Sequence, residues 1–89
     1  MKKTGFYVIG GQYDAYCFGH ADTLIGAKRI ATKNVYYCDN WQGWAKPMIY
    51  PAEDCEMATN FYGRQPCPKY GARGWCWDSD SKRWEECRA

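Results

Sequence analysis

The residue types that could act as nucleophiles are six cysteines, and a single histidine could serve as their base. Cys17 lies three residues before His20, and a thiol activated by an imidazole is a common arrangement for covalent catalysis. Because such pairs are assembled by the fold, several of the other cysteines could also reach His20. The sequence around these residues carries no protease or transferase signature. A thiol enzyme is therefore the third of three hypotheses, and we expect no catalytic residue.

The cysteine spacing argues against a structural metal. Structural zinc sites use closely spaced pairs such as C-x2-C, whereas at least eight residues separate any two cysteines here. We therefore expect neither a metal nor a cofactor. The four apolar residues Phe6–Ile9 fall short of the roughly 7–15 of a secretory signal. A cytoplasmic location with free thiols is expected, although an exported protein could pair the cysteines in ways that the spacing does not decide.

Two other arrangements are also better explained without catalysis. The acidic neighbours Glu53-Asp54 and Glu85-Glu86 would point to opposite faces of a strand, which does not suit a two-carboxylate site. Gly10-Gly11 follows an apolar run, but no helix begins directly after it, as a phosphate-binding loop would require. We interpret the carboxylates as surface groups and the glycines as a turn.

The first half of the chain predicts a hairpin followed by a helix. Phe6–Ile9 and Tyr13–Phe18 are β-prone runs divided by a glycine pair, which is typical of a β-hairpin. Thr23–Lys33 has helical periodicity, with Asp22 as the expected N-cap and Asn34 as the expected C-cap. The residues expected to share its apolar face are Leu24, Ala27, Ile30 and Ala31.

The second half predicts shorter strands and more loop. Met48–Tyr50 lies between two prolines and is expected to be an edge strand. A turn or one helical turn is expected from Glu53 to Thr59, and an extended loop from Gly63 to Gly74. Trp75–Asp78 and Arg83–Glu86 should form a hairpin in which Trp77 faces Trp84, Cys76 faces Glu85 and Trp75 faces Glu86.

The composition is unusual for a folded domain. Leu, Ile and Val together number seven in 89 residues, against sixteen aromatic residues and a net charge of only +2. A disordered chain would have few aromatic residues and a higher net charge, and no apolar run approaches the roughly 20 residues of a membrane span. We predict one small α+β domain over residues 1–89. It would be an antiparallel sheet in the order β-β-α-β-β-β, with one helix packed on a face.

Because so few aliphatic residues are present, most aromatic rings must build the core, and the surplus is the functional signal. Tryptophan, tyrosine and arginine are enriched at protein interfaces. The leading hypothesis is a non-enzymatic protein-interaction module, and the expected contact residues are Trp41, Trp44, Tyr50, Glu53 and Asp54. A homodimer is a further alternative. The runner-up is a protein that stacks single-stranded nucleic acid on sheet aromatics, although the near-neutral charge lacks the expected basic footprint.

Four motifs carry a resemblance over about residues 6–62: GGQY at residues 10–13, TLxGAKRxA at 23–31, DNWQGW at 39–44 and IYxxED at 49–54. With these motifs the chain resembles short proteins of gut bacteria that are often carried on mobile elements and have no assigned activity. The resemblance implies a cytoplasmic accessory protein of phage, plasmid or transposon type. Such proteins often bind a host protein, so an inhibitor of a bacterial defence system (an anti-CRISPR, for example) or of a regulatory protein is expected. The chain lacks the strong negative charge of inhibitors that mimic DNA.

Overall fold

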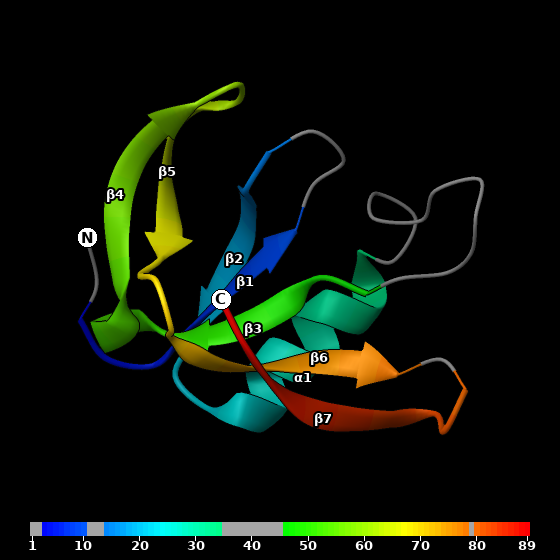
Figure 1. Cartoon of the computed structure of the whole chain (residues 1–89). Coiled ribbons are helices and arrows are strands. Elements are labelled where there is room, and N and C mark those ends of the chain that lie inside the picture. Colours follow the sequence, from blue (N-terminus) through cyan, green and yellow to red (C-terminus); the bar gives the residue numbers. More distant parts are fainter. Residues whose placement is uncertain (1–2, 11–13, 35–45, 79) are drawn as a thin grey trace.

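The computed structural model describes residues 3–10, 14–34, 46–78 and 80–89. Within them, five strands form an antiparallel sheet in the order β2-β1-β3-β6-β7, and β4 and β5 form a second sheet of two strands. Helix α1 lies against one face of the larger sheet, and the β4–β5 hairpin rises beside β2 (Figure 1). The elements are β1 (Phe6–Gly10), β2 (Tyr16–Ala21), α1 (Leu24–Lys33), β3 (Met48–Pro51), a short 3-10 helix (Ala52–Asp54), β4 (Cys55–Asn60), β5 (Gly63–Pro68), β6 (Arg73–Asp78) and β7 (Arg83–Arg88). The predicted α+β class is confirmed.

Two small cores lie on opposite faces of the larger sheet, because alternate residues of a strand point to opposite sides. On the helix face, Val8 and Ile49 pack against Ala27 and Ala31, and all four are fully buried. Alanine at these helix positions allows α1 to lie close to the strands. The other face is built from Tyr7, Ile9, Tyr50, Ala52, Cys55 and Ala72.

The two predicted hairpins of the larger sheet are confirmed. β1 pairs with β2, but the register shifts between Val8 and Ile9, so that Phe18 is an extra residue on β2. Such a bulge bends the strand and increases its twist. In the other hairpin Trp77 pairs with Trp84 and Cys76 with Glu85, as predicted.

Strand β3 corrects one expectation, since it lies in the centre of the sheet and not at an edge. It pairs with β1 on one side and with β6 on the other. Pro47 and Pro51 lie at its two ends, so the residues between them keep the N–H groups that a central strand needs.

The segment after β3 corrects two more expectations. Instead of a helical turn reaching Thr59 and a loop from Gly63, the chain forms one turn of 3-10 helix and then the β4–β5 hairpin. This hairpin lies along the outer edge of β2. The Cys17 N–H donates to Gln65 Oε1 at 3.0 Å, and Asn60 Nδ2 donates to the Ala15 carbonyl at 2.8 Å. Side chains of the second sheet therefore satisfy one backbone group of β2 and one of Ala15, the residue just before β2.

Candidate functional site

The residues predicted to contact a partner do not form one described surface. Trp41 and Trp44 lie outside the described residues. Tyr50 is in the core with 2% of its surface exposed, Glu53 is exposed and Asp54 is partly buried. Of the five, Glu53 and Asp54 are the ones that the structure places together near the surface.

Tyr50 has a structural role in this arrangement. Its phenol donates to Met48 Sδ at 3.6 Å. Burial is the main reason that the pKa of Tyr50 rises to about 12, and the neighbouring Cys87 thiol adds to the effect. A partner could reach this ring only after the core had opened, so Tyr50 does not serve as a surface contact.

Glu53 and Asp54 lie where the chain passes from the larger sheet into the β4–β5 hairpin. Glu53 borders a depression of about 510 Å³ whose other lining residues include Lys3, Glu56 and Lys69. The Asp54 carbonyl accepts a hydrogen bond from the Lys69 N–H at 2.8 Å, which joins the 3-10 helix to the end of β5. The depression therefore combines charges of both signs and does not concentrate negative charge.

Burial makes four of the five described thiols harder to ionise. All five described cysteines are free, and burial raises the pKa of four of them, Cys17, Cys55, Cys67 and Cys87. A reactive cysteine needs a lowered pKa, because the thiolate is the nucleophile. His20 donates from Nε2 to the Thr4 carbonyl at 2.6 Å, so a backbone group occupies that ring nitrogen.

The part of the chain that the structure describes contains no cluster of metal-binding side chains. No group of three or more His, Cys, Asp or Glu side chains there could hold a metal ion. No helix among the same residues is long and apolar enough to cross a bilayer.

The tryptophans of the β6–β7 hairpin pack within the protein. Trp75 and Trp84 border the core beneath α1. The rings of Trp77 and Trp84 meet edge to face at 5.7 Å, and Lys46 Nζ lies 3.7 Å from the centroid of the Trp77 ring. Each of these three rings is partly buried and packs against the core, a second ring or Lys46, so they do not form the open row of rings that base stacking needs.

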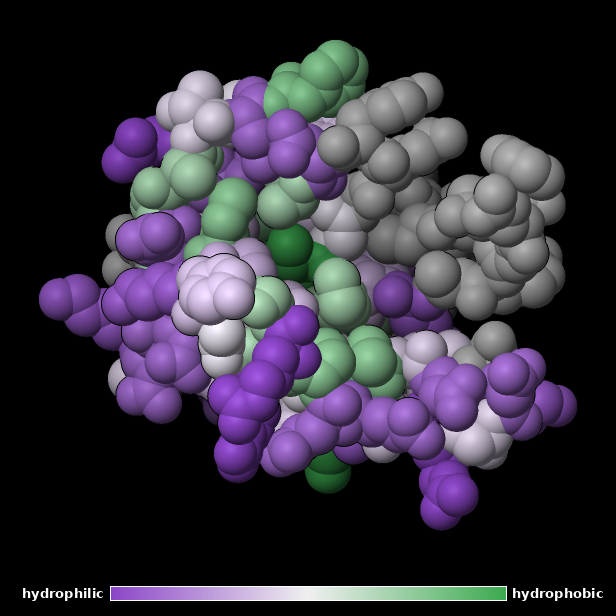
Figure 2. Space-filling model, in the orientation of Figure 1, coloured by the Kyte–Doolittle hydropathy of each residue, from purple (hydrophilic) through white to green (hydrophobic). Residues whose placement is uncertain are grey.

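A connected set of aromatic rings that the sequence analysis did not select lies at the tip of the β4–β5 hairpin. Tyr62 contacts Phe61 and Tyr16 at 5.2 Å between centroids, and Tyr16 contacts Phe18 at 5.0 Å. Phe61 is 72% exposed and Tyr16 is 39% exposed. Figure 2 shows apolar surface at the top of the view, where this hairpin ends in Figure 1. We call Phe61, Tyr62, Tyr16 and Phe18 the hairpin-tip cluster.

The local sequence explains why these rings are displayed. Asn60 Oδ1 accepts a hydrogen bond from the Tyr62 N–H at 2.9 Å, and Asp14 Oδ2 accepts one from the Phe61 N–H at 3.1 Å. Gly63 has φ +93°, a conformation that residues with a side chain rarely adopt. Asn and Gly at the two sides of a Phe-Tyr pair are a turn signature, and this pattern could have identified two aromatic residues at a hairpin tip.

No protein-family model, no curated protein and no solved structure matches the chain.

Proposed function

We propose that this protein is a non-enzymatic interaction module that binds another protein through the hairpin-tip cluster. The observation that carries the proposal is the 72% exposure of Phe61 within a set of mutually contacting rings. Burying a phenylalanine side chain contributes roughly 1.5–3 kcal/mol relative to leaving it in water. A partner that covered Phe61 would gain much of this free energy.

The arrangement of the rings supports a preformed protein-binding surface. Tyr62 contacts two neighbouring rings, and its backbone N–H is held by Asn60. Because these contacts restrict the ring before a partner arrives, less conformational entropy is lost on binding. Rigid aromatic side chains at the centre of a contact are typical hot spots.

The same geometry is less suited to single-stranded nucleic acid. Successive rings meet at 72°, 70° and 89°, so each described contact directs the edge of one ring at the face of the next. Stacked bases need exposed parallel faces. The Asp14 carboxylate that holds the Phe61 N–H would also repel phosphate groups.

For the partner, we propose a bacterial defence or regulatory protein that this chain inhibits in the cytoplasm, for example as an anti-CRISPR. This part of the proposal follows from the resemblance to accessory proteins of mobile elements. Trp41, Trp44, Glu53 and Asp54 remain proposed contacts, while Tyr50 is replaced by the hairpin-tip cluster.

The test compares three forms of the full chain as bait in a bacterial lysate: wild type, Phe61→Ser and Tyr70→Ser. Tyr70 is the matched control, because it is a fully exposed aromatic residue in the turn between β5 and β6. We expect at least one protein to be captured by wild type and by Tyr70→Ser but lost with Phe61→Ser. That protein, once purified, should bind wild type at least about tenfold more tightly than Phe61→Ser.

Equal loss with both variants, or no loss with either, would contradict the proposal. Sedimentation velocity of the isolated chain gives a separate readout. A dimer that Phe61→Ser abolishes would assign the cluster to a second copy of this chain, and the proposal of a different partner protein would then be wrong.

A further inference from the structure

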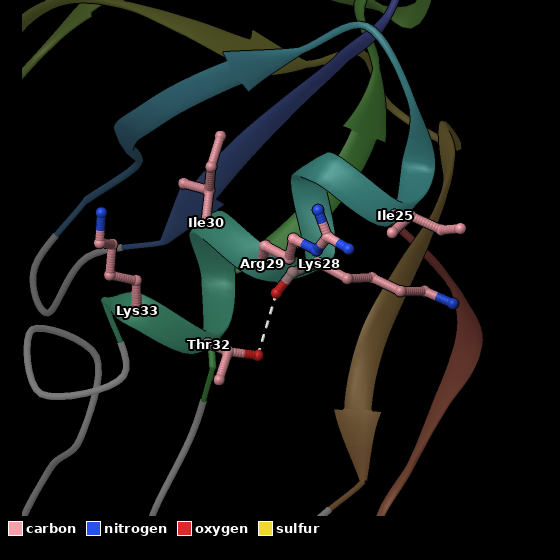
Figure 3. Close-up of a pocket in the computed structure, with 6 residues that line it drawn as sticks. All are labelled: Ile25, Lys28, Arg29, Ile30, Thr32 and Lys33. Atoms are coloured by element: carbon pink, nitrogen blue, oxygen red, sulfur yellow. Dashed lines mark hydrogen bonds between the residues drawn. The ribbon is translucent and has the colours of Figure 1, made fainter.

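The outward face of α1 carries a second surface, distant in sequence from the hairpin tip. An open depression of about 530 Å³ runs along the helix, lined by Ile25, Lys28, Arg29, Ile30, Thr32 and Lys33. Figure 3 shows Ile25 and Lys28 extending to one side of the helix and Lys33 extending to the other, with Arg29 between them. The depression therefore has cationic groups along its length and an isoleucine at one end.

None of the described residues forms an ion pair with the cations of this surface. No acidic residue occurs within α1. Among the described residues one ion pair is found, between Arg73 and Glu86 of the β6–β7 hairpin, and none involves Lys28, Arg29 or Lys33. Lys46 adds a further cation beside the helix, since its Nζ donates to Thr32 Oγ1 at 3.1 Å. An anionic partner is therefore complementary to this face.

The exposed isoleucine distinguishes between kinds of anionic partner. Ile25 is 64% exposed, and it lies three and four residues before Lys28 and Arg29, which places all three on neighbouring positions of the helix surface. A phosphodiester backbone would pair with the cations but leave Ile25 in water. A protein segment with both acidic and apolar side chains would satisfy both.

We propose that the outer face of α1 binds an acidic, partly apolar segment of a partner protein, with Asp or Glu on the cations and an apolar side chain on Ile25. The surface is separate from the hairpin-tip cluster, and the inference does not depend on that cluster. A protein with both surfaces could hold two parts of one partner, which increases the total affinity if both parts are reached at once.

The test measures binding of the full chain to a fluorescent amphipathic peptide built from Glu and Leu, by anisotropy at low and at physiological salt. Arg29→Glu/Lys33→Glu should weaken binding about tenfold, and Ile25→Ser about threefold with an unchanged salt dependence. The matched control Lys69→Glu/Lys82→Glu reverses two exposed cations elsewhere and should change the affinity less than about twofold. Phe61→Ser should have no effect, which separates this surface from the proposed function.

A neutral double variant and a peptide of opposite charge test whether the charges themselves are responsible for binding. Arg29→Gln/Lys33→Gln should also weaken binding, without placing a negative charge near the helix C-terminus, where it would disfavour the helix. A peptide of the same pattern with Lys in place of Glu should not bind. The proposal is wrong if no Glu-Leu peptide binds at low salt. It is also wrong if single-stranded DNA or anionic vesicles bind this face more tightly than the peptide and lose affinity with the same variants.

Discussion

The ring of Tyr50 lies over Gly74, where strands β3 and β6 run side by side. A Cβ atom at Gly74 would come within 2.4 Å of the Ile49 carbonyl and 2.5 Å of the Tyr50 ring. Atoms at such distances overlap, so the strand pairing and the burial of Tyr50 both require a residue without a side chain at this position. The absence of a side chain at Gly74 thereby leaves the space that the buried Tyr50 ring occupies.

Gly74→Ala should lower the free energy of unfolding by about 1–3 kcal/mol, because the added methyl group overpacks this contact. The measurement is urea unfolding followed by tryptophan fluorescence. Gly19→Ala is the matched control, since its Cβ would meet only Ile30 methyl groups at an ordinary 3.5 Å. Equal stability of the two variants would mean that the close approach at Gly74 is not a constraint.

The buried thiol and phenol predict a loss of stability in alkaline solution. Burial, followed by the neighbouring Asp54 carboxylate, raises the pKa of Cys55 from 9.0 to about 12, and burial is also the main cause of the rise for Tyr50, from 10.0 to about 12. In the unfolded chain Cys55 loses its proton near pH 9.0 and Tyr50 near pH 10.0, whereas the folded protein retains both protons up to about pH 12. The free energy of unfolding should therefore fall as the pH rises through this range, after a plateau below about pH 9.

Urea unfolding at a series of pH values from neutral to strongly alkaline checks this expectation. Cys55→Ala and Tyr50→Phe each remove one of the titrating groups, so each should make the alkaline decline shallower than in wild type. A wild-type decline that begins well below pH 9, or one that neither substitution changes, would assign the alkaline instability to other groups.

At the scale of elements, the start of α1 shows how a helix boundary is set by one side chain. Thr23 has extended backbone angles, and its hydroxyl accepts a hydrogen bond from the Gly26 N–H at 3.1 Å. Thr23 is therefore the N-cap, and the expectation that Asp22 caps the helix was wrong. Both residue types are good caps, so composition alone could not choose between neighbours.

Thr23→Ala should destabilise the protein by about 1 kcal/mol, because the Gly26 N–H would lose its acceptor. Asp22→Ala should have an effect within about 0.5 kcal/mol, as is usual for surface substitutions. Thermal unfolding followed by circular dichroism at 222 nm, in the helical band, distinguishes the two. The reverse order of effects would restore Asp22 as the cap.

Locally determined elements were predicted well from the sequence. The β6–β7 register followed from the turn between two adjacent strands, and the buried face of α1 followed from helical periodicity. The central position of β3 depends on pairing with β6, more than twenty residues later in the sequence. The strand β5 is rich in Gly and Pro, and its pairing with β4 overrides those weak propensities.

The candidate site was predictable only in part, for the same reason. Its residue type does not distinguish Tyr50 from the exposed rings; Tyr50 is buried because it packs with Tyr7 and Ile9 in the core and lies over Gly74. Phe61 is exposed and Tyr62 is partly exposed in the Asn60–Gly63 turn, and Tyr16 contacts Tyr62 from a strand distant in sequence. The aromatic surplus was therefore a sound signal of exposed rings, but the sequence did not identify which rings were exposed.

At the scale of the whole molecule, Lys46 contacts both helix α1 and the β6–β7 hairpin. Its Nζ donates to Thr32 near the end of α1 and lies over the Trp77 ring of the β6–β7 hairpin. The same Nζ is 5.7 Å from the centroid of Trp84. A single ammonium group thus connects the helix to the outer hairpin.

Lys46→Met retains the length of the side chain but removes the charge and the donor. We expect a loss of about 0.5–1 kcal/mol in the free energy of unfolding, the usual range for a solvent-accessible cation–π contact, together with a change in tryptophan fluorescence of the folded protein. Lys69→Met, at an exposed position, should change neither quantity. Unchanged fluorescence in Lys46→Met would show that the ammonium group does not rest on the indole rings.

The contacts of Gln65 and Asn60 with β2 have a consequence for self-association. An unpaired sheet edge is a template on which the strand of another chain can add, and this is how cross-β aggregates grow. At the start of β2 the Cys17 N–H, and just before it the Ala15 carbonyl, are already bonded to amide side chains, which cannot propagate a ladder as a backbone would. The bulge at Phe18 further bends this edge. The hairpin that displays the aromatic rings therefore also blocks the beginning of the β2 edge, and a partner that displaced the hairpin would expose these two backbone groups to strand addition.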